Sequence, residues 1–364
     1  MIEILIEGMT ENPGGKEAYI VNLYKTFDRT RFHFTFISYN DEIAYERFLR
    51  ESGAEIVRLP PRYDGLFRYR KALDELFRRK KFDVLWAHKT TLSSCEVLEI
   101  ARRRGVPLRI VHSHSSSNMG GRLTFILHSV NKMFVRGWAN AYFACSEPAA
   151  AWFYGKKPCT LLKNGIDVEK FRFNPECRKR IRNQLGIADC FAIVHVGRFG
   201  VEKNHKKLLG VFHEVRKVRD NAKLILCGDG EERGNIEEQI RELDLEEGVL
   251  LLGIISNVHE ILQAADLMVM PSLFEGLPFA LLEAQAAGLH CVVSDTVSRE
   301  SDILGGTIFL PLSASNTLWA ERILGMEISR DRHDAADQMR REGYDVVDCA
   351  RSVEKLIETR IRSE

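Results

Sequence analysis

The sequence predicts an α/β protein built from two doubly wound parallel-sheet domains. Short apolar runs alternate with amphipathic segments in both halves of the chain, which is typical of parallel strands joined by helices. The length of 364 residues exceeds what one core commonly accommodates and suits two domains. Between the two series lie Asn164-Gly165-Ile166-Asp167 and Asn174-Pro175, whose Asn-Gly and Asn-Pro steps favour a turn and a new segment.

Each series supplies enough strands for its own sheet. In the first half we expect strands at 2–6, 32–38, 55–59, 83–87, 108–112 and 140–145. The second half repeats the pattern at 191–196, 223–227, 249–252, 266–270, 290–294 and 307–310. Residues 344–361 then form a terminal amphipathic pattern that predicts a final helix.

The composition is that of an ordinary globular protein, with a net charge of +1, but the charge is unevenly spread. Residues 1–170 hold 27 Lys and Arg against 19 Asp and Glu, whereas the remainder holds 25 against 32. A basic first half suits an anionic membrane or a phosphate-bearing acceptor, although surface charge also drifts without function. No recognition motif accompanies the charge, so nucleic-acid binding is not expected.

The eight cysteines are scattered, with no Cys-x-x-Cys pair, and several lie in apolar runs. We interpret them as buried thiols in a reducing compartment. The first residues carry no basic leader followed by an apolar core, and no stretch of eighteen apolar residues occurs. These observations predict a cytoplasmic protein.

Two glutamates, Glu275 and Glu283, flank a strand-to-helix junction in Phe-Glu-Gly-Leu-Pro-Phe-Ala-Leu-Leu-Glu at 274–283. Pro278 suits the first turn of a helix that we expect to continue to Ala287. Glu275 therefore lies at the carboxyl end of a strand, where open α/β sheets bind ligands. The free N–H groups around 277–281 favour an anion or sugar hydroxyls. Two such glutamates also occur by chance, so the pair alone does not define a site.

Basic and glycine-containing loops follow two other predicted strands. Arg198 comes after the strand 191–196 and Lys203 begins the next helix, so both can neutralise a diphosphate. Gly14 and Gly15, in the loop after the first strand, allow the backbone to approach a phosphate or sugar. Each feature has a plainer explanation, because single cations are commonly solvated and glycines are common in βα turns.

Two histidines, His88 and His114, follow the predicted strands 83–87 and 108–112. Carboxyl ends of strands suit a binding site, although a lone histidine is more often structural. His112 points the same way as His114 if both extend along a strand. The run from Ser115 to Asn118 can supply hydroxyl contacts to an acceptor or form a plain loop.

Residues 122–138 combine apolar side chains with Arg122, Lys132 and Arg136. Such a helix can lie in a membrane interface, or it can pack on the first domain with a solvated basic edge, which is the commoner arrangement. The basic run 78–81 allows the same two explanations, since it can also be the cationic end of a helix.

Together with segment 274–283, four further motifs carry a family resemblance: Asn-Gly-Ile-Asp at 164–167, Gly-Arg at 197–198, Glu-Lys-Asn at 202–204 and Gly-Asp-Gly at 228–230. With these motifs the chain resembles the retaining glycosyltransferases of family 4, in particular those of bacterial capsule and exopolysaccharide synthesis. The resemblance implies the GT-B fold, in which two Rossmann-like domains face each other across a cleft. It predicts an acceptor-side domain at 1–168, a donor-binding domain at 169–343, and packing of the helix 344–361 back on the first domain.

The same resemblance implies roles for individual residues. Glu283 would bind the ribose hydroxyls and Glu275 the transferred sugar, with Arg198 and Lys203 at the diphosphate. His88 would contact the sugar, with His114 as second choice. The other donor-binding positions implied are Gly14 and Gly15 over the phosphates, Gly253, Ile254 and Ile255 near the base, and Gly276, Leu277, Pro278 and Phe279 in the glutamate motif. Gly228-Asp229-Gly230 is better explained as a plain turn than as a dinucleotide fingerprint.

The resemblance therefore predicts a retaining transferase that needs no metal and no cofactor besides its donor. The donor would be a nucleotide-diphosphate sugar, with UDP favoured over GDP. The acceptor would be a saccharide hydroxyl, on a lipid-linked chain at the inner membrane. The sequence agrees in having no Asp-x-Asp site of the kind that carries a divalent ion in other glycosyltransferases.

Three other interpretations compete with a transferase. A sugar-nucleotide epimerase or hydrolase of the same fold would bind the donor and need no second sugar. A non-catalytic sugar-nucleotide-binding subunit would keep the donor site, but intact Glu275, Glu283, Arg198 and Lys203 argue against lost chemistry. An NAD-dependent oxidoreductase is disfavoured because no Gly-x-Gly-x-x-Gly follows a predicted strand.

Overall fold

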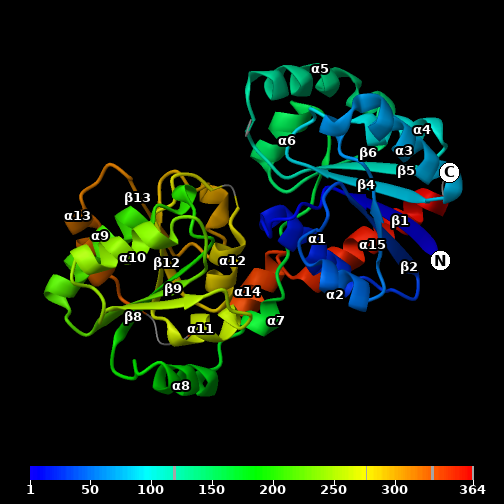
Figure 1. Ribbon diagram of the computed structural model, residues 1–364. Helices are drawn as coiled ribbons and strands as arrows, with labels where there is room; N and C mark the ends of the chain where they lie inside the picture. Colours follow the sequence, from blue (N-terminus) through cyan, green and yellow to red (C-terminus); the bar gives the residue numbers. More distant parts are fainter. Residues whose placement is uncertain (118–119, 276, 329–331, 363–364) are drawn as a thin grey trace. The chain divides into compact units, whose positions relative to one another are not determined.

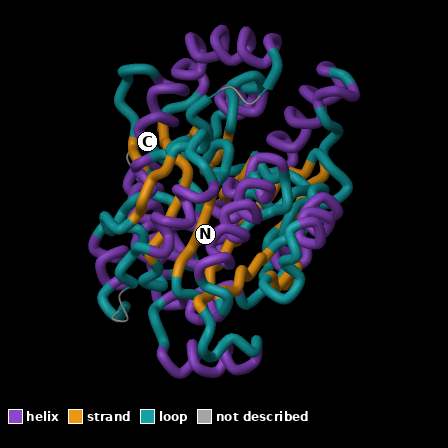
Figure 2. The backbone as a smooth tube through the Cα atoms, turned by 90° about the vertical axis from the view of Figure 1, so that its left-hand side faces the viewer, coloured by secondary structure: helices purple, strands orange, loops and turns teal. Residues whose placement is uncertain are grey.

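The computed structural model describes residues 1–117, 120–275, 277–328 and 332–362. The chain divides into two compact units, Met1–Gly165 with Val346–Glu364, and Ile166–Asp345. Each unit contains a parallel sheet with helices around it (Figures 1 and 2). The predicted α/β class with two doubly wound sheets is confirmed.

The first unit has the strand order β3-β2-β1-β4-β5-β6-β7. The order reverses at β1, so neighbouring connections leave β1 and β4 in opposite directions and create a topological switch point. The strands are β1 (Ile2–Glu7), β2 (Phe32–Ser38), β3 (Glu55–Arg58), β4 (Val84–Lys89), β5 (Leu108–Ser113), β6 (Ala141–Ala144) and β7 (Thr160–Leu161). The helices are α1 (Gly15–Thr26), α2 (Glu46–Glu51), η1 (Arg62–Asp64), α3 (Leu66–Arg79), α4 (Glu96–Arg103), α5 (Arg122–Trp138), α6 (Glu147–Tyr154) and α15 (Val346–Arg362).

The second unit repeats this plan with the order β10-β9-β8-β11-β12-β13, and its switch point lies between β8 and β11. The strands are β8 (Phe191–Val196), β9 (Ala222–Cys227), β10 (Val249–Gly253), β11 (Leu267–Met270), β12 (His290–Ser294) and β13 (Thr307–Leu310). The helices are α7 (Val168–Phe171), α8 (Pro175–Gln184), η2 (Val201–Lys203), α9 (His205–Val218), α10 (Arg233–Glu242), α11 (Val258–Ala264), α12 (Phe279–Ala286), η3 (Arg299–Ser301), α13 (Asn316–Leu324) and α14 (Ala335–Arg341).

The central strands of the second sheet are buried on both faces, as their unbroken apolar runs predict. Successive residues of β8 contribute to two different cores: Ala192 and Val194 join one, while Phe191 and Ile193 join the other. This alternation follows from the two-residue period of a strand. Because the strands are buried on both faces, the polar residues lie in the loops that follow the carboxyl ends of the strands.

The terminal helix α15 belongs to the first unit, where it packs against α1 and β5. The Glu354 carboxylate accepts a hydrogen bond of 2.7 Å from the Asp28 N–H, and Glu358 pairs with Arg31. The helix begins two residues later than the predicted 344, because Asp345 forms a parallel bridge with Ile166.

Two sequence expectations for the first sheet were wrong. The strand expected at 83–87 continues to Lys89, so His88 lies inside β4 and not after it. The strand continues because His88 and Lys89 pair in register with His112 and Ser113 of β5. The short strand β7 was also not expected from the sequence.

Candidate functional site

The loops after β8 and β11 form the polar edge of the second unit at its switch point. An ion pair joins them, because the Lys203 ammonium at the end of η2 contacts the Glu275 carboxylate after β11. Both side chains are largely buried, with 15% and 17% of their surfaces exposed. The Leu273 N–H also donates to the Glu202 carbonyl at 2.8 Å, which fixes the two loops to each other.

Glu275 is held from the other side as well. Its backbone bridges to Val297, and its carbonyl accepts a hydrogen bond of 3.2 Å from the Ser298 N–H. The neighbouring Gly276 lies outside the described residues. The carboxylate of Glu275 is therefore positioned by a cation and by its own backbone before any ligand binds.

Arg198 follows β8 on the same edge but points to different partners. Its guanidinium lies 3.2 Å from the Glu202 carboxylate and 3.7 Å from that of Glu231, and about half of the side chain is exposed. These are surface ion pairs, which stabilise weakly and exchange readily. Arg198 can consequently turn toward an anionic ligand at little cost.

Glu283 lies in the second turn of α12, whose amino terminus carries no side-chain cap among the described residues. Pro278 is the capping residue itself and not part of the first turn, and the helix ends at Ala286. The Glu283 carboxylate receives no hydrogen bond from the residues that the structure describes. Burial raises its pKa to about 7, against the opposing charge of Lys170.

The glycines at 228 and 230 do more than form a plain turn. Both have positive φ, and a Cβ on Gly228 would lie 1.9 Å from the Gly197 carbonyl oxygen. A Cβ on Gly230 would lie 2.6 Å from the Phe199 carbonyl oxygen. The pair therefore allows the loop after β9 to pack directly on the loop that carries Arg198.

The residues expected near the base lie at the end of β10. The Gly253 carbonyl accepts a hydrogen bond of 2.9 Å from the Gly228 N–H, which joins this loop to the preceding one. Ile254 is 85% exposed, whereas Ile255 packs on the core. The loops after β8, β9 and β10 are thus connected in one series along the sheet edge.

In the first unit the switch point lies at the ends of β1 and β4. The loop after β1 approaches β4 so closely that a Cβ on Gly8 would lie 2.3 Å from the His88 carbonyl oxygen. The Lys16 ammonium donates to the Gly8 carbonyl. Gly14 is the capping residue of α1, which begins at Gly15 and has no side-chain cap among the described residues. The amino terminus of α1 therefore remains available to an anion.

Histidines gather next to this loop. One ring nitrogen each of His88, His112 and His114 lies within 4.8 Å of the other two, and Nδ1 of His88 is 2.9 Å from Nε2 of His114. His88 and His112 are buried, and His114 is partly exposed. Burial, followed by neighbouring positive charge, holds the pKa of His88 and of His114 well below the usual value.

Sequence reasoning missed a buried ion pair in the same unit. The Lys89 ammonium of β4 lies 2.8 Å from the Glu7 carboxylate of β1, with 8% and 6% of the side chains exposed. Burial alone would lower the pKa of Lys89, but the charge of Glu7 raises it above the usual value. The only sequence signal for this pair is a charged residue at the end of each of two apolar runs.

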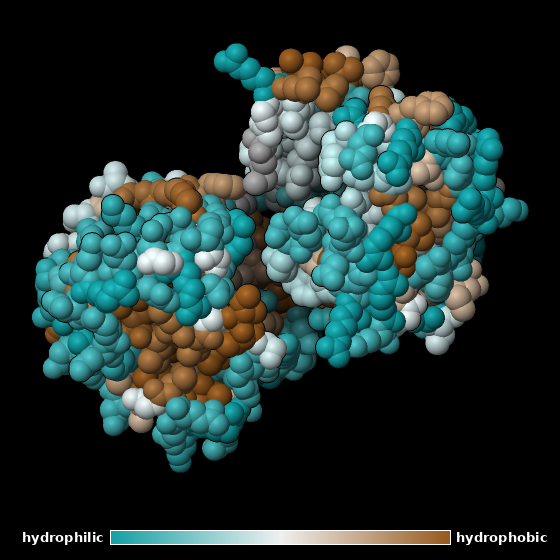
Figure 3. All heavy atoms as spheres, viewed as in Figure 1, coloured by the Kyte–Doolittle hydropathy of each residue, from teal (hydrophilic) through white to brown (hydrophobic). Residues whose placement is uncertain are grey.

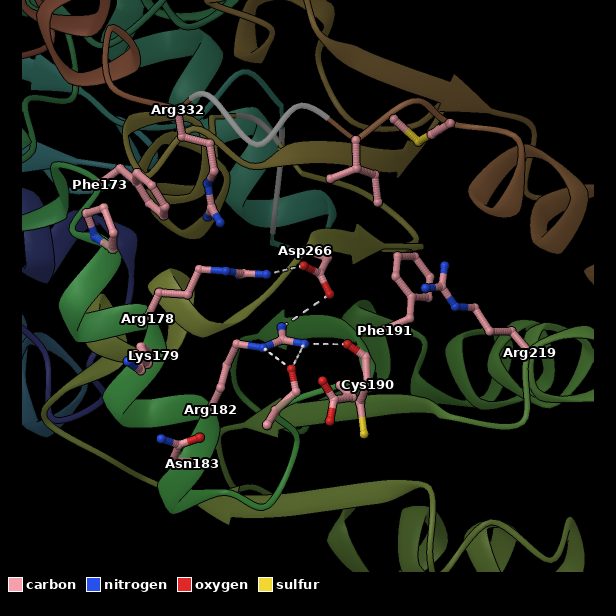
Figure 4. Close-up of a pocket in the computed structure, with 15 residues that line it drawn as sticks. Phe173, Arg178, Lys179, Arg182, Asn183, Cys190, Phe191, Arg219, Asp266 and Arg332 are labelled. Carbon is pink, nitrogen blue, oxygen red and sulfur yellow. Dashed lines mark hydrogen bonds and ion pairs between the residues drawn. The ribbon is translucent and has the colours of Figure 1, made fainter.

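A cavity of about 920 Å³ lies at the opposite edge of the second sheet, beside the amino ends of β8 and β11 (Figure 4). Arg178 and Arg182 point toward Asp266 and also donate to the last carbonyls of α11. Arg332 likewise donates to backbone carbonyls. Since these guanidinium groups are engaged with the protein, we interpret this basic cavity as structural.

Helix α5 buries very little of its surface. Only His128 and Val135 are buried among its residues, although the helix runs from Arg122 to Trp138. Its exposed large apolar side chains are visible as a brown area over α5 in Figure 3, and are those of Leu123, Phe125, Ile126, Val130, Met133 and Phe134. The helix does pack on the first unit, where the Leu92 N–H donates to Nδ1 of His128, but most of its large apolar side chains are exposed. No helix in the described part of the chain has the length and apolar character needed to cross a bilayer.

Two family models match the chain: Glycosyltransferase Family 4 over residues 13–170 and Glycosyl transferases group 1 over residues 178–337. EpsF of Bacillus subtilis (strain 168), named as a glycosyltransferase, is 35% identical over 88% of this chain and 85% of its own length. An Escherichia coli UDP-Gal:alpha-D-GlcNAc-diphosphoundecaprenol alpha-1,3-galactosyltransferase is 26% identical over 62% of this chain and 60% of its own length.

Solved structures give the same fold. HepE of Anabaena, crystallised in complex with UDP, has a TM-score of 0.81 at 17% identity and covers 99% of this chain and 100% of its own. A glycosyltransferase from Rickettsia africae ESF-5 has a TM-score of 0.79 at 13% identity, with 100% and 99% covered. The predicted GT-B fold is confirmed. The chain thus belongs to glycosyltransferase family 4, and it is a glycosyltransferase related to those of bacterial exopolysaccharide synthesis.

Proposed function

We propose that the protein transfers a sugar from a nucleotide-diphosphate sugar to a hydroxyl of a saccharide, with retention of the anomeric configuration and without a metal ion. The observation that carries this proposal is the arrangement of two carboxylates at the edge of the second sheet. There the Glu283 carboxylate, which has no hydrogen-bond partner among the described residues, lies on the same strand-to-helix motif as Glu275, which Lys203 holds in place. A carboxylate that can accept two hydroxyl hydrogen bonds is the group expected for a ribose.

The donor would be bound through groups with separate tasks. The Glu283 carboxylate accepts hydrogen bonds from the ribose hydroxyls, and the Glu275 carboxylate accepts hydrogen bonds from hydroxyls of the transferred sugar. Arg198 leaves its surface partners for the diphosphate, where Lys203 also contributes positive charge. Gly253, Ile254 and Ile255 lie beside the base, and the first N–H groups of α12, with Leu277, Pro278 and Phe279, line the motif. The charge of Arg198 and Lys203 would replace that of a divalent ion as the leaving group departs.

Retention of the anomeric configuration would follow from attack by the acceptor hydroxyl on the same face of the sugar from which the diphosphate leaves. Glu275 is paired with Lys203. A carboxylate in such an ion pair is better suited to bind hydroxyls than to act as a nucleophile. In the first unit, His88 would contact the sugar, with His114 as the alternative, while Gly14 and Gly15 cover the phosphates. UDP is favoured as the nucleotide because the Escherichia coli relative is named for a UDP-Gal donor and the HepE structure holds UDP.

We further propose a lipid-linked acceptor at the cytoplasmic face of the membrane, in capsule or exopolysaccharide synthesis. The Escherichia coli relative is named for a diphosphoundecaprenol acceptor. In this chain, the exposed apolar side chains of α5 accompany Arg122 and Arg136 on the same helix. An apolar stripe beside cations is the pattern of a helix that lies in an anionic membrane interface.

The test is a calorimetric panel of UDP, GDP, ADP and their common sugars, followed by transfer assays with product analysis. We expect one nucleotide class to bind, Glu283→Ala to weaken binding, Glu275→Ala mainly to lower turnover, and Arg198→Ala to do both. Glu246→Ala, an exposed carboxylate of the same unit, is the control. Unchanged binding and kinetics in all three site variants would contradict the site. Acceptor-independent release of free sugar would instead indicate a hydrolase, and binding without any turnover would indicate a non-catalytic subunit.

A further inference from the structure

His112 is fully buried and has no hydrogen-bond partner in the part of the chain that the structure describes. Both of its ring nitrogens are inaccessible and unpaired among the described residues. Trp86 stacks on the ring, and Tyr19 and Phe143 meet it edge-on. An unpaired buried polar group costs about 1–3 kcal/mol, so a phenylalanine would fill this aromatic site at lower cost. A ligand that binds these nitrogens would offset this cost, since none of the described residues does so.

Two further histidines, His88 and His114, lie beside His112. His88 is the register partner of His112 on the adjacent strand, and His114 follows on the same side of β5. The three side chains bring one ring nitrogen each to within 4.8 Å of the other two, and an ion would replace the contact of 2.9 Å between Nδ1 of His88 and Nε2 of His114.

We propose that His88, His112 and His114 together bind a divalent transition-metal ion of the class that imidazole prefers, such as Zn²⁺, Co²⁺ or Ni²⁺. Ligand bonds of about 2.0–2.1 Å require the nitrogens, which lie up to 4.8 Å apart, to draw together around the ion. Three histidines leave a fourth position for water, on the side where His114 reaches solvent. The site is distinct from the donor's charge-neutralising groups, which lie in the second unit.

The ion would inhibit the enzyme and would not assist it. This consequence rests on the proposed function, because an ion bound to His88 and His114 occupies the side chains proposed to contact the sugar. Binding should also be reversible. No described carboxylate or carbonyl accepts a hydrogen bond from the outer nitrogen of His112, and the Lys16 ammonium adds positive charge that acts on His88 and His114.

The experiment is a Co²⁺ titration of the full-length protein, prepared without a polyhistidine tag, in which visible d–d absorption reports the ion's coordination. We expect one equivalent of Co²⁺ in a tetrahedral site, removed by a chelator. His112→Phe should lower the affinity at least tenfold, and Lys16→Met should raise it. His195→Phe is the matched control, since His195 is a buried strand histidine outside the cluster, and its Nε2 has no partner among the described residues.

His114→Gln provides a second variant, at a partly exposed position, in case His112→Phe does not fold. Loss of the Co²⁺ signal in His114→Gln, with circular dichroism unchanged, supports the site. Equal Co²⁺ binding by the wild type, His112→Phe and His114→Gln would mean an adventitious ion only and would overturn the proposal, as would absence of a tetrahedral signal in the wild type. Co²⁺ binding that leaves sugar transfer unchanged would support the metal site and contradict the sugar contact of His88 instead.

Discussion

Among the proposed site residues, Glu283 is the one whose surroundings bear most directly on its role in donor binding. The side chain has no hydrogen-bond donor among the described residues, and burial raises its pKa to about 7. At neutral pH the free protein therefore holds this group partly protonated. Ribose hydroxyls donate hydrogen bonds, so they bind the ionised form, and donor binding must compete with the proton.

We predict that donor affinity rises by about tenfold between pH 6 and pH 8, because the ionised fraction of a group with this pKa grows by that factor. Glu283→Gln should bind more weakly and with little dependence on pH. Calorimetry with the preferred nucleotide, in buffers of different ionisation enthalpy, would show proton release on binding to the wild type. Equal pH dependence in both proteins would contradict the assignment.

At the same scale, the sequence could identify the types of side chain but not their partners. It located Glu275 and Arg198 in loops after strands, because apolar runs end just before them, and it located Lys203 at the start of the next helix. It could not show that Lys203 pairs with Glu275 while Arg198 contacts Glu202 and Glu231. Such partners are set by which loops are adjacent at the sheet edge, and local patterns contain no information about that.

At the scale of elements, β1 and β4 are joined by the buried pair of Glu7 and Lys89. The end of β4 was predicted too early because a lysine after an apolar run resembles a strand end. The compensating charge lies 82 positions away in the sequence. Similarly, the periodicity of α5 predicted an amphipathic helix at the right place but could not show that few residues cover its apolar face.

For the buried pair we predict that Lys89→Met costs about 3–5 kcal/mol in the free energy of unfolding, because it leaves the Glu7 charge buried and unpaired. The double variant Glu7→Gln/Lys89→Met should recover much of this loss. Urea unfolding measures both. Lys80→Met is the control, since its pair with Glu55 is more exposed and should contribute about 1 kcal/mol or less. A loss of stability in Lys89→Met no larger than in this control would contradict the prediction.

For α5 we predict that the full-length protein sediments with vesicles rich in anionic lipid and less with neutral ones. Ile126→Ser/Met133→Ser should weaken this binding about tenfold or more, because the apolar area inserted into the interface is reduced. The matched control is Val218→Ser/Leu318→Ser, which removes exposed apolar side chains from the second unit. Equal losses in the two double variants, or none in either, would contradict an interface formed by α5.

At the scale of the whole molecule, sequence patterns identified two doubly wound parallel sheets, because buried parallel strands are nearly continuous apolar runs. The loop glycines were harder to interpret. Gly228 and Gly230 are required by close packing on the carbonyls of Gly197 and Phe199, and this contact follows from the neighbouring positions of β8 and β9. The chain also returns to the first unit with α15, so its last helix stabilises its first sheet.

This connectivity predicts a separation of the two units in thermal unfolding. Ile357 of α15 and Ile323 of α13 are buried to the same degree, at 0% and 1% exposure, but they belong to different units. Replacement of a buried isoleucine by alanine costs about 2–5 kcal/mol. In scanning calorimetry, Ile357→Ala should lower the transition of the first unit, and Ile323→Ala should lower the other one. A nucleotide, most of whose proposed contacts lie in the second unit, should mainly raise the transition that Ile323→Ala affects. If both variants lowered one and the same transition, α15 and α13 would unfold together, and the separation into two units would be contradicted.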